Sequence, residues 1–112
     1  MRIPIFILAL AAALSGAPLT ARAADTVPKF DTMKNCKAEI ADAGGVGETL
    51  ESCMNDEEQA RKELVEHWRE YRSEDKRACL GETVSDGTPS YVELVTCLEI
   101  ASDIKARSRD EQ

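Results

Sequence analysis

The residues of this chain with the most evident chemistry are four cysteines, and their spacing decides which chemistry is open to them. They are Cys36, Cys53, Cys79 and Cys97. A zinc or haem site would need C-x-x-C pairs or several histidines, but these cysteines are widely separated and His67 is the single histidine. The pattern therefore predicts disulfide bonds, and it predicts neither a metal site nor a cofactor.

Other side chains that could take part in catalysis lack the partners that catalysis requires. His67 has no nucleophile beside it to activate, and no serine lies in a nucleophile elbow. The acids Glu63, Glu66 and Glu70 recur at helical spacing among basic residues, which is typical of a solvated helix face. Because no acid, base and nucleophile converge in the sequence, we predict that the protein is not an enzyme.

The beginning of the chain predicts export. A basic residue precedes an apolar run over residues 3–14, and an A-x-A site ends at Ala23, so residues 1–23 have the order of a cleavable signal peptide. The alternative is an uncleaved membrane anchor, but the strongly apolar part is only about 12 residues long, which is short for a bilayer span. Cleavage after Ala23 leaves one small domain, residues 24–112, that is periplasmic or secreted.

The charge of the chain limits its partners. The 112 residues include 21 acids and 14 basic residues, for a formal charge of −7, and loss of Arg2 and Arg22 with the signal peptide takes this to −9. Nucleic acids and anionic lipids are bound by clustered Lys and Arg, so we expect no nucleic-acid partner and no membrane contact after cleavage. A protein partner, cationic in character, fits the charge; the sequence does not indicate an oligomeric state.

Periodicity and helix breakers predict an all-α fold, a three-helix hairpin-type arrangement with one long central helix. The helices are expected over residues 31–43, 48–80 and 90–105. The central segment contains neither Gly nor Pro, which favours a single uninterrupted helix. The chain ends, residues 24–30 and 106–112, are expected to fray.

Local signals support these boundaries. Asp31 or Thr32 can cap the first helix, and residues 90–93, Ser-Tyr-Val-Glu, have the form of a capping box that opens the third. An apolar stripe is expected along the central helix, interrupted by the polar residues 55–59. The stripe consists of Leu50, Cys53, Met54, Ala60, Leu64, Trp68, Tyr71 and Cys79.

The turns select one disulfide pairing. Gly44-Gly45 lies midway between the first two cysteines, and residues 86–89, Asp-Gly-Thr-Pro, lie midway between the last two, so each pair sits at equal heights on the arms of a helical hairpin. A single helix over residues 48–80 would hold the second and third cysteines roughly 39 Å apart, whereas a disulfide spans about 7 Å between Cα atoms. The predicted bridges are Cys36–Cys53 and Cys79–Cys97.

One group of residues has a composition suited to binding a partner. Trp68, Tyr71 and Arg72 fall on adjacent turns of the predicted central helix, and Trp, Tyr and Arg dominate binding hot spots. The alternative is that Trp68 and Tyr71 fill the core, because few other large side chains are available to do so.

The sequence also resembles known groups of proteins. Residues 89–99, Pro-Ser-Tyr-Val-Glu-Leu-Val-Thr-Cys-Leu-Glu, together with the signal peptide, a preceding cysteine pair and a Trp-bearing helix, resemble small exported proteins of alphaproteobacteria. A looser likeness is to the LprI-type lysozyme-inhibitor domain, a small cysteine-stapled helical module of the periplasm. The chain departs from that domain in a longer interval between the arginine and the next cysteine, and in Arg72-Ser73 where the domain has Arg-Asp. The residues that match in order are Cys53, Trp68, Arg72, Cys79, Cys97 and Arg107.

Two functions follow from the sequence. The first is a non-catalytic periplasmic or secreted protein with an interaction or structural role. The second, which the likeness to the LprI-type domain implies, is inhibition of lysozyme or of another cationic cell-envelope hydrolase. A charge of −9 would attract such a basic enzyme at low ionic strength.

Overall fold

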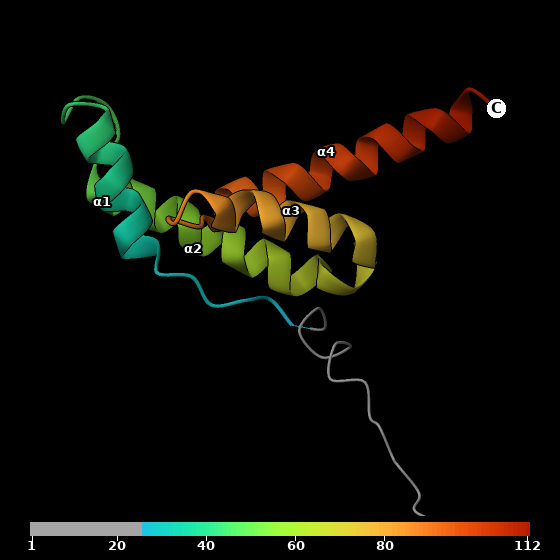
Figure 1. Ribbon diagram of the computed structural model, residues 1–112, viewed down its shortest axis with the longest axis horizontal. Coiled ribbons are helices and arrows are strands. Elements are labelled where there is room, and N and C mark those ends of the chain that lie inside the picture. Colours follow the sequence, from blue (N-terminus) through green and yellow to red (C-terminus); the bar gives the residue numbers. More distant parts are fainter. Residues whose placement is uncertain (1–25) are drawn as a thin grey trace, which may run out of the picture.

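The computed structural model describes residues 26–112, and within them the fold is all-α, as the sequence predicts. Figure 1 shows α3 running in the direction opposite to α2, with α1 at one end of the bundle, and α4 packs against both α2 and α3. The predicted signal peptide, residues 1–23, lies outside the described residues. The elements are α1 (Thr32–Asp42), α2 (Leu50–His67), a 3-10 turn (Trp68–Glu70), α3 (Ser73–Ser85) and α4 (Tyr91–Asp110).

The predicted long central helix is two helices, which makes four helices in the described part of the chain where three were expected. After the 3-10 turn, Tyr71 and Arg72 have extended backbones, with ψ of 144° and 143°, and α3 then runs in the direction opposite to α2 (Figure 1). The reversal brings Trp68 and Cys79 into one core cluster, whereas a continuous helix would separate them by more than three turns. Tertiary burial therefore overrides the helix propensity of this segment.

The helix caps follow the local signals. Asp31 Oδ1 accepts a hydrogen bond from Lys34 N at 3.1 Å, which confirms the predicted start of α1. Ser90 Oγ accepts one from Glu93 N at 3.2 Å and caps α4. At the other end of α1, Gly45 has a φ of 77° and its N–H bonds to Ile40 O at 3.0 Å, a left-handed termination that glycine adopts without strain.

Both predicted disulfides are present, and each joins the two helices that flank one turn. Cys36–Cys53 connects α1 to α2 with a Cα–Cα distance of 5.8 Å, and Cys79–Cys97 connects α3 to α4 at 5.7 Å. The chain-entropy model assigns about 3 kcal/mol to a bridge that closes a loop of this length. No cysteine is free.

The core lies where α4 meets α2 and α3, and it is small. Leu64, Leu94 and Leu98 are fully buried at its centre, and Trp68 and Tyr91 are each 4% exposed. A core of this size leaves a small domain marginally stable, so the two bridges contribute substantially to its stability.

The N-terminal segment is anchored rather than frayed over residues 27–30, contrary to expectation. The Tyr91 hydroxyl donates to Pro28 O at 2.7 Å and accepts from Phe30 N at 3.0 Å. The rings of Phe30 and Tyr91 also pack with centroids 4.7 Å apart, and Val27 contacts the same cluster. The sequence-based prediction of fraying overlooked an aromatic residue that is distant in sequence.

At the C-terminal end, where fraying was expected from residue 106, α4 continues to Asp110. Arg107 and Arg109 lie in its last turn, where cations interact favourably with the helix dipole. Residues 106–110 are exposed, so this turn is held by helical hydrogen bonds and not by the core. None of the helices over residues 26–112 is long and apolar enough to cross a membrane.

The anchoring of the N-terminal segment can be tested with Tyr91→Phe. The change removes the hydroxyl that bridges Pro28 and Phe30, so we expect a loss of about 1 kcal/mol in the free energy of unfolding and faster hydrogen exchange at the Phe30 amide. Urea unfolding and NMR hydrogen exchange measure both. Tyr71→Phe is the matched control, and equal Phe30 exchange rates in the two variants would contradict the anchoring.

Candidate functional site

The three predicted binding residues occupy different environments at the turn between α2 and α3. Trp68 belongs to the core, and Lys76, itself 7% exposed, holds its Nζ 4.9 Å from the ring centroid. Tyr71 is partly buried against the same core. Arg72 is exposed, with its guanidinium 3.7 Å from the Glu74 carboxylate. Of the three, Tyr71 and Arg72 are therefore the ones that present surface to a partner.

Carboxylates surround Tyr71 and form an acidic surface. Burial and the nearby Glu63, Glu99 and Glu70 raise the pKa of the Tyr71 hydroxyl. We call these four residues the Tyr71 surface. A hydrogen bond with Glu63, together with burial and the charge of Asp103, raises the pKa of Glu99. The carboxyl groups of α2 and α4 are thus close enough to share a proton, and a cation placed between them would relieve their repulsion.

His67 adjoins this surface and is paired with an acid. Its Nδ1 lies 2.8 Å from Glu70 Oε2. This hydrogen bond first, and then the charges of Glu70, Glu66 and Glu63, raise the pKa of the imidazole. The group that His67 contacts is a carboxylate and not a nucleophile, which fits a surface residue better than a general base.

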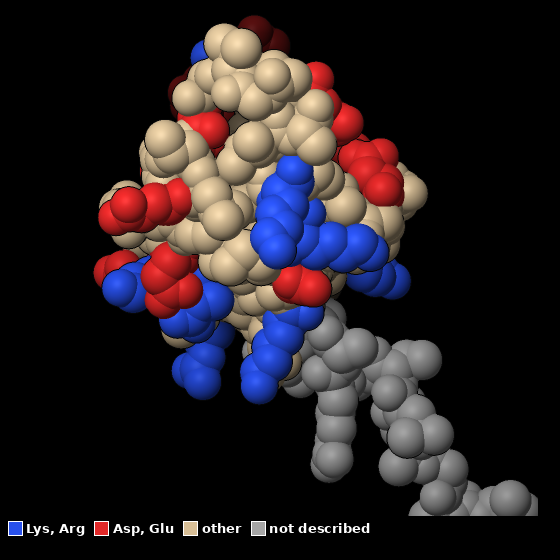
Figure 2. Space-filling view, turned by 90° about the vertical axis from the view of Figure 1, so that its left-hand side faces the viewer, with Lys and Arg blue, Asp and Glu red and all other residues tan. Residues whose placement is uncertain are grey.

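Basic side chains are grouped on part of the surface at the α1 end of the bundle (Figure 2). Figure 2 faces the end that carries α1, where Lys and Arg side chains gather on the lower part of the surface. Lys29, Lys34 and Lys37 are exposed in this part of the chain. The turn that holds Tyr71 lies at the opposite end of α2 (Figure 1). The carboxylates of the Tyr71 surface would attract a cationic partner.

Glu57 of α2 is a buried acid, 2% exposed, that was not predicted from the sequence. One carboxylate oxygen accepts a hydrogen bond from Tyr91 N at 2.7 Å, and the other accepts one from the Ser90 hydroxyl. Both donors lie at the first turn of α4, where the helix dipole favours a negative charge. Glu57 therefore fastens the beginning of α4 to the middle of α2.

Thr83 of α3 completes this network. Its Oγ1 accepts a hydrogen bond from Ser90 N at 3.0 Å and donates to Glu93 Oε2 at 3.0 Å. In a capping box the glutamate would bond the Ser90 N–H itself. Here the Thr83 hydroxyl lies between the Ser90 N–H and the Glu93 carboxylate and bonds to both. The predicted capping box is therefore half formed, and the bonds of Thr83 that replace its other half hold α3 against α4.

The Ser90–Glu57 contact has the composition of a nucleophile and its base, but its surroundings favour a structural role. Ser90 is 1% exposed, so no substrate can reach its oxygen. The same oxygen also accepts the Glu93 N–H that caps α4. The proton and one lone pair of this hydroxyl are therefore used in holding helices together.

Glu57 could have been found from spacing. It lies four residues after Cys53 and three before Ala60, on the buried stripe of α2. The acidic run around it was interpreted as a polar interruption because a charged residue is rarely buried unless it is paired. Its partners, Ser90 and the N–H of Tyr91, are more than 30 residues away.

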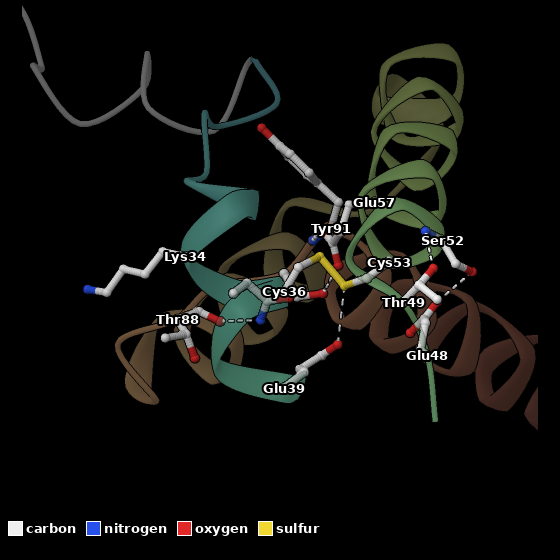
Figure 3. The surroundings of a disulfide bond; sticks show 12 residues. Lys34, Cys36, Glu39, Glu48, Thr49, Ser52, Cys53, Glu57, Thr88 and Tyr91 are labelled. Atoms are coloured by element: carbon white, nitrogen blue, oxygen red, sulfur yellow. Dashed lines mark hydrogen bonds between the residues drawn. A yellow bond between two sulfur atoms is a disulfide. The ribbon is translucent and has the colours of Figure 1, made fainter. Parts of the chain in front are cut away.

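A carboxylate also lies against each disulfide, in two copies of the same pattern. In Cys36-x-x-Glu39, the Glu39 carboxylate is 3.5 Å from Cys53 Sγ (Figure 3). In Cys79-x-x-Glu82, the Glu82 carboxylate is 3.4 Å from Cys97 Sγ. Neither sulfur carries a proton, so these are close contacts rather than thiol hydrogen bonds. The negative charge lies beside the atom that an incoming thiolate would attack.

Glu39, Glu48 and Cys53 also bring three potential metal-ligating atoms within 4.8 Å of one another. The Cys53 sulfur is committed to a disulfide and cannot serve as a thiolate ligand. Burial and the charges of Glu57 and Glu93 raise the pKa of Glu39, while a hydrogen bond with Asp56 raises that of Glu48. The donor set does not fit a structural metal site, for which four ligands are usual.

A groove of about 560 Å³ runs between α3 and α4, beside the second disulfide. Its apolar lining includes Val92 and Ile100, and its acidic lining comprises Glu82, Asp86 and Glu93. No histidine, lysine or free thiol is among the residues that line it, and its titratable side chains are all carboxylates. Comparisons of the chain with protein-family models, curated proteins and solved structures give no match.

The role of Glu57 can be tested with Glu57→Gln. The amide carries no charge and directs an NH₂ group at one of the two donors, so we expect a loss of about 2–3 kcal/mol in the free energy of unfolding. Urea denaturation with circular dichroism measures this loss. Glu66→Gln, which removes an exposed charge from the same helix, should change stability by less than about 0.5 kcal/mol. Equal effects of the two substitutions would show that Glu57 does not dock α4.

The carboxylate beside the second disulfide should slow its reduction. Cys97 is partly exposed, whereas Cys36 and Cys53 are buried, so a thiolate should attack Cys97 Sγ first and release Cys79 as a thiolate. A like charge at about 4 Å costs about 1 kcal/mol in water, which corresponds to roughly fivefold in rate. We expect Glu82→Gln to accelerate reduction by glutathione by that factor.

Alkylation of the released thiols followed by mass spectrometry gives the rate of reduction at each bridge. Cysteamine, whose ammonium group offsets the charge of its thiolate, should show a smaller difference between the native protein and Glu82→Gln. Glu74→Gln in the first turn of α3 is the control for charge. If Glu74→Gln accelerated glutathione reduction as much as Glu82→Gln, net charge rather than the local contact would set the rate.

Proposed function

We propose that the protein is a non-catalytic, periplasmic or secreted protein that acts by binding another protein. The two disulfides support an oxidising compartment, since such bonds are rare in the cytosol. The predicted signal peptide supports export. The buried serine–carboxylate pair is used to dock helices, which supports a binding role over a catalytic one.

The observation that carries this proposal is the Tyr71 surface. An aromatic ring that is only partly buried lies among carboxylates from α2, the following turn and α4. Aromatic side chains supply contact area at small entropic cost, and carboxylates pair with Arg or Lys. The partner that suits this surface is a protein with a basic patch.

A second candidate function is inhibition of lysozyme or of another cationic cell-envelope hydrolase. It is supported by the likeness to the LprI-type domain and by the formal charge of −9 on the predicted mature chain. In this case the basic enzyme would meet the Tyr71 surface and Arg72, which is one of the residues that match the domain in order.

The test of the binding proposal is capture from periplasmic extract by the immobilised chain of residues 24–112. We expect a basic protein to be retained, and retention to fall at least tenfold in Glu63→Gln/Glu99→Gln. Glu51→Gln/Asp110→Asn removes the same charge from exposed positions at the far ends of α2 and α4. Retention of no specific protein, or equal losses in both double variants, would contradict binding at the Tyr71 surface.

The inhibitor proposal has a separate test. The mature chain is added to lysozyme and bacterial cells at low and at physiological ionic strength, and lysis is followed by turbidity. Inhibition that weakens in Glu63→Gln/Glu99→Gln but not in Glu51→Gln/Asp110→Asn is the expected result. Unchanged lysis at low ionic strength would exclude lysozyme as the target while leaving a different basic partner to the capture experiment.

A further inference from the structure

The outer side of α4 carries an apolar stripe that no part of residues 26–112 covers. Val92, Ile100 and Ile104 are 39%, 55% and 60% exposed, and Thr96 lies between them at the same spacing of four residues. This side is opposite to the one that buries Leu94 and Leu98. The helix therefore has apolar residues on two opposite sides, one in the core and one exposed. Exposed apolar rows of this kind commonly mark an interface.

The C-terminal half of α4 also extends beyond the rest of the bundle (Figure 1). Lys105 makes the last side-chain contact with the bundle in this half, an ion pair of 2.9 Å with Asp75 of α3. The following residues, 106–110, are helical but exposed. A helical segment without tertiary packing is marginal in water, so a partner for this projecting half would stabilise it.

The groove between α3 and α4 is acidic, whereas the exposed side of the projecting half carries an arginine. It lies beside the first half of α4, with Val92 on its apolar side and Glu82, Asp86 and Glu93 as its acids. The projecting half carries Ile104 on the exposed side and Arg107 one turn further along it. Groove and projection are therefore complementary in both apolar surface and charge.

We propose that two copies of the chain pair antiparallel through α4, so that the projecting half of each helix lies in the groove between α3 and α4 of the other. With Thr96 placed opposite Ile100 of the second copy, Arg107 of that copy comes level with Pro89, next to the acidic Asp86. A parallel pair would instead set the acidic beginnings of the two helices against each other. The antiparallel arrangement is a closed two-fold interface.

This pairing rests on other residues than the proposed function, because none of the four residues of the Tyr71 surface lines the groove between α3 and α4. The net charge of −9 on each predicted mature chain opposes association at long range. At about 0.15 M salt this repulsion is screened beyond about 8 Å, whereas contacts within the interface are retained. Association should therefore be measured at that ionic strength.

The experiment is sedimentation equilibrium of the mature, disulfide-bonded chain over a range of concentrations. We expect a monomer–dimer equilibrium that Ile100→Glu weakens at least tenfold. Ile100 is more than half exposed, so the variant should fold, and circular dichroism verifies this. A chain that stays monomeric at millimolar concentration, or a dimer that Ile100→Glu leaves unchanged, overturns the proposal.

A charge exchange tests the direction of the pair. Arg107→Glu and Asp86→Arg should each weaken the dimer by about tenfold, and the double variant should recover most of that loss. Arg109→Glu makes the same charge change in the same turn, but two residues on, which turns it to the far side of the helix; it should have little effect. Equal effects of Arg107→Glu and Arg109→Glu, or no recovery in the double variant, would overturn the antiparallel arrangement.

Discussion

A buried carboxylate must be paired, and in this protein the pairing of Glu57 determines where the last helix begins. Its two oxygens receive the Ser90 hydroxyl and the Tyr91 N–H, so α4 can start at only one height along α2. Removing one partner of such a group leaves a buried charge uncompensated, which costs several kcal/mol. The register of α4 then fixes the position of Tyr91, and through its hydroxyl the path of the N-terminal segment.

The disulfides and the hydrogen bonds of Glu57 connect different helices around the small core. Each bridge fastens one pair of helices close to the turn that joins them, α1 to α2 and α3 to α4. Neither bridge ties the first pair to the second. That connection is made by Glu57 of α2, which accepts hydrogen bonds at the beginning of α4, and by Leu64, Trp68 and Leu98 in the core. Covalent and polar contacts are thus complementary rather than redundant.

The features that the sequence predicted correctly are those with local causes. The cap at Asp31, the start of α4 at Ser90 and the disulfide pairing all follow from residues near the breakers. The break after His67 has no Gly or Pro to mark it; Ser73-Glu74-Asp75 is a weak helix-start signal there, and burial of Trp68 decides the outcome. The pairing was therefore right although one premise, the roughly 39 Å between Cys53 and Cys79 along a single helix, was wrong. Glu57 was missed because its partners are remote in sequence.

The buried polar groups hold the helices together, so we look for the functional site on the surface. In the described part of the chain, the hydroxyl, carboxylate and amide groups at the start of α4 bond to one another. The surface, in contrast, has carboxylates that repel one another around Tyr71 and an apolar row on α4 that water solvates poorly. Both are costly for an isolated chain and are relieved by a partner, the first by a cation and the second by an apolar surface. Two such surfaces on a covalently stapled frame support the proposal that the protein acts by association.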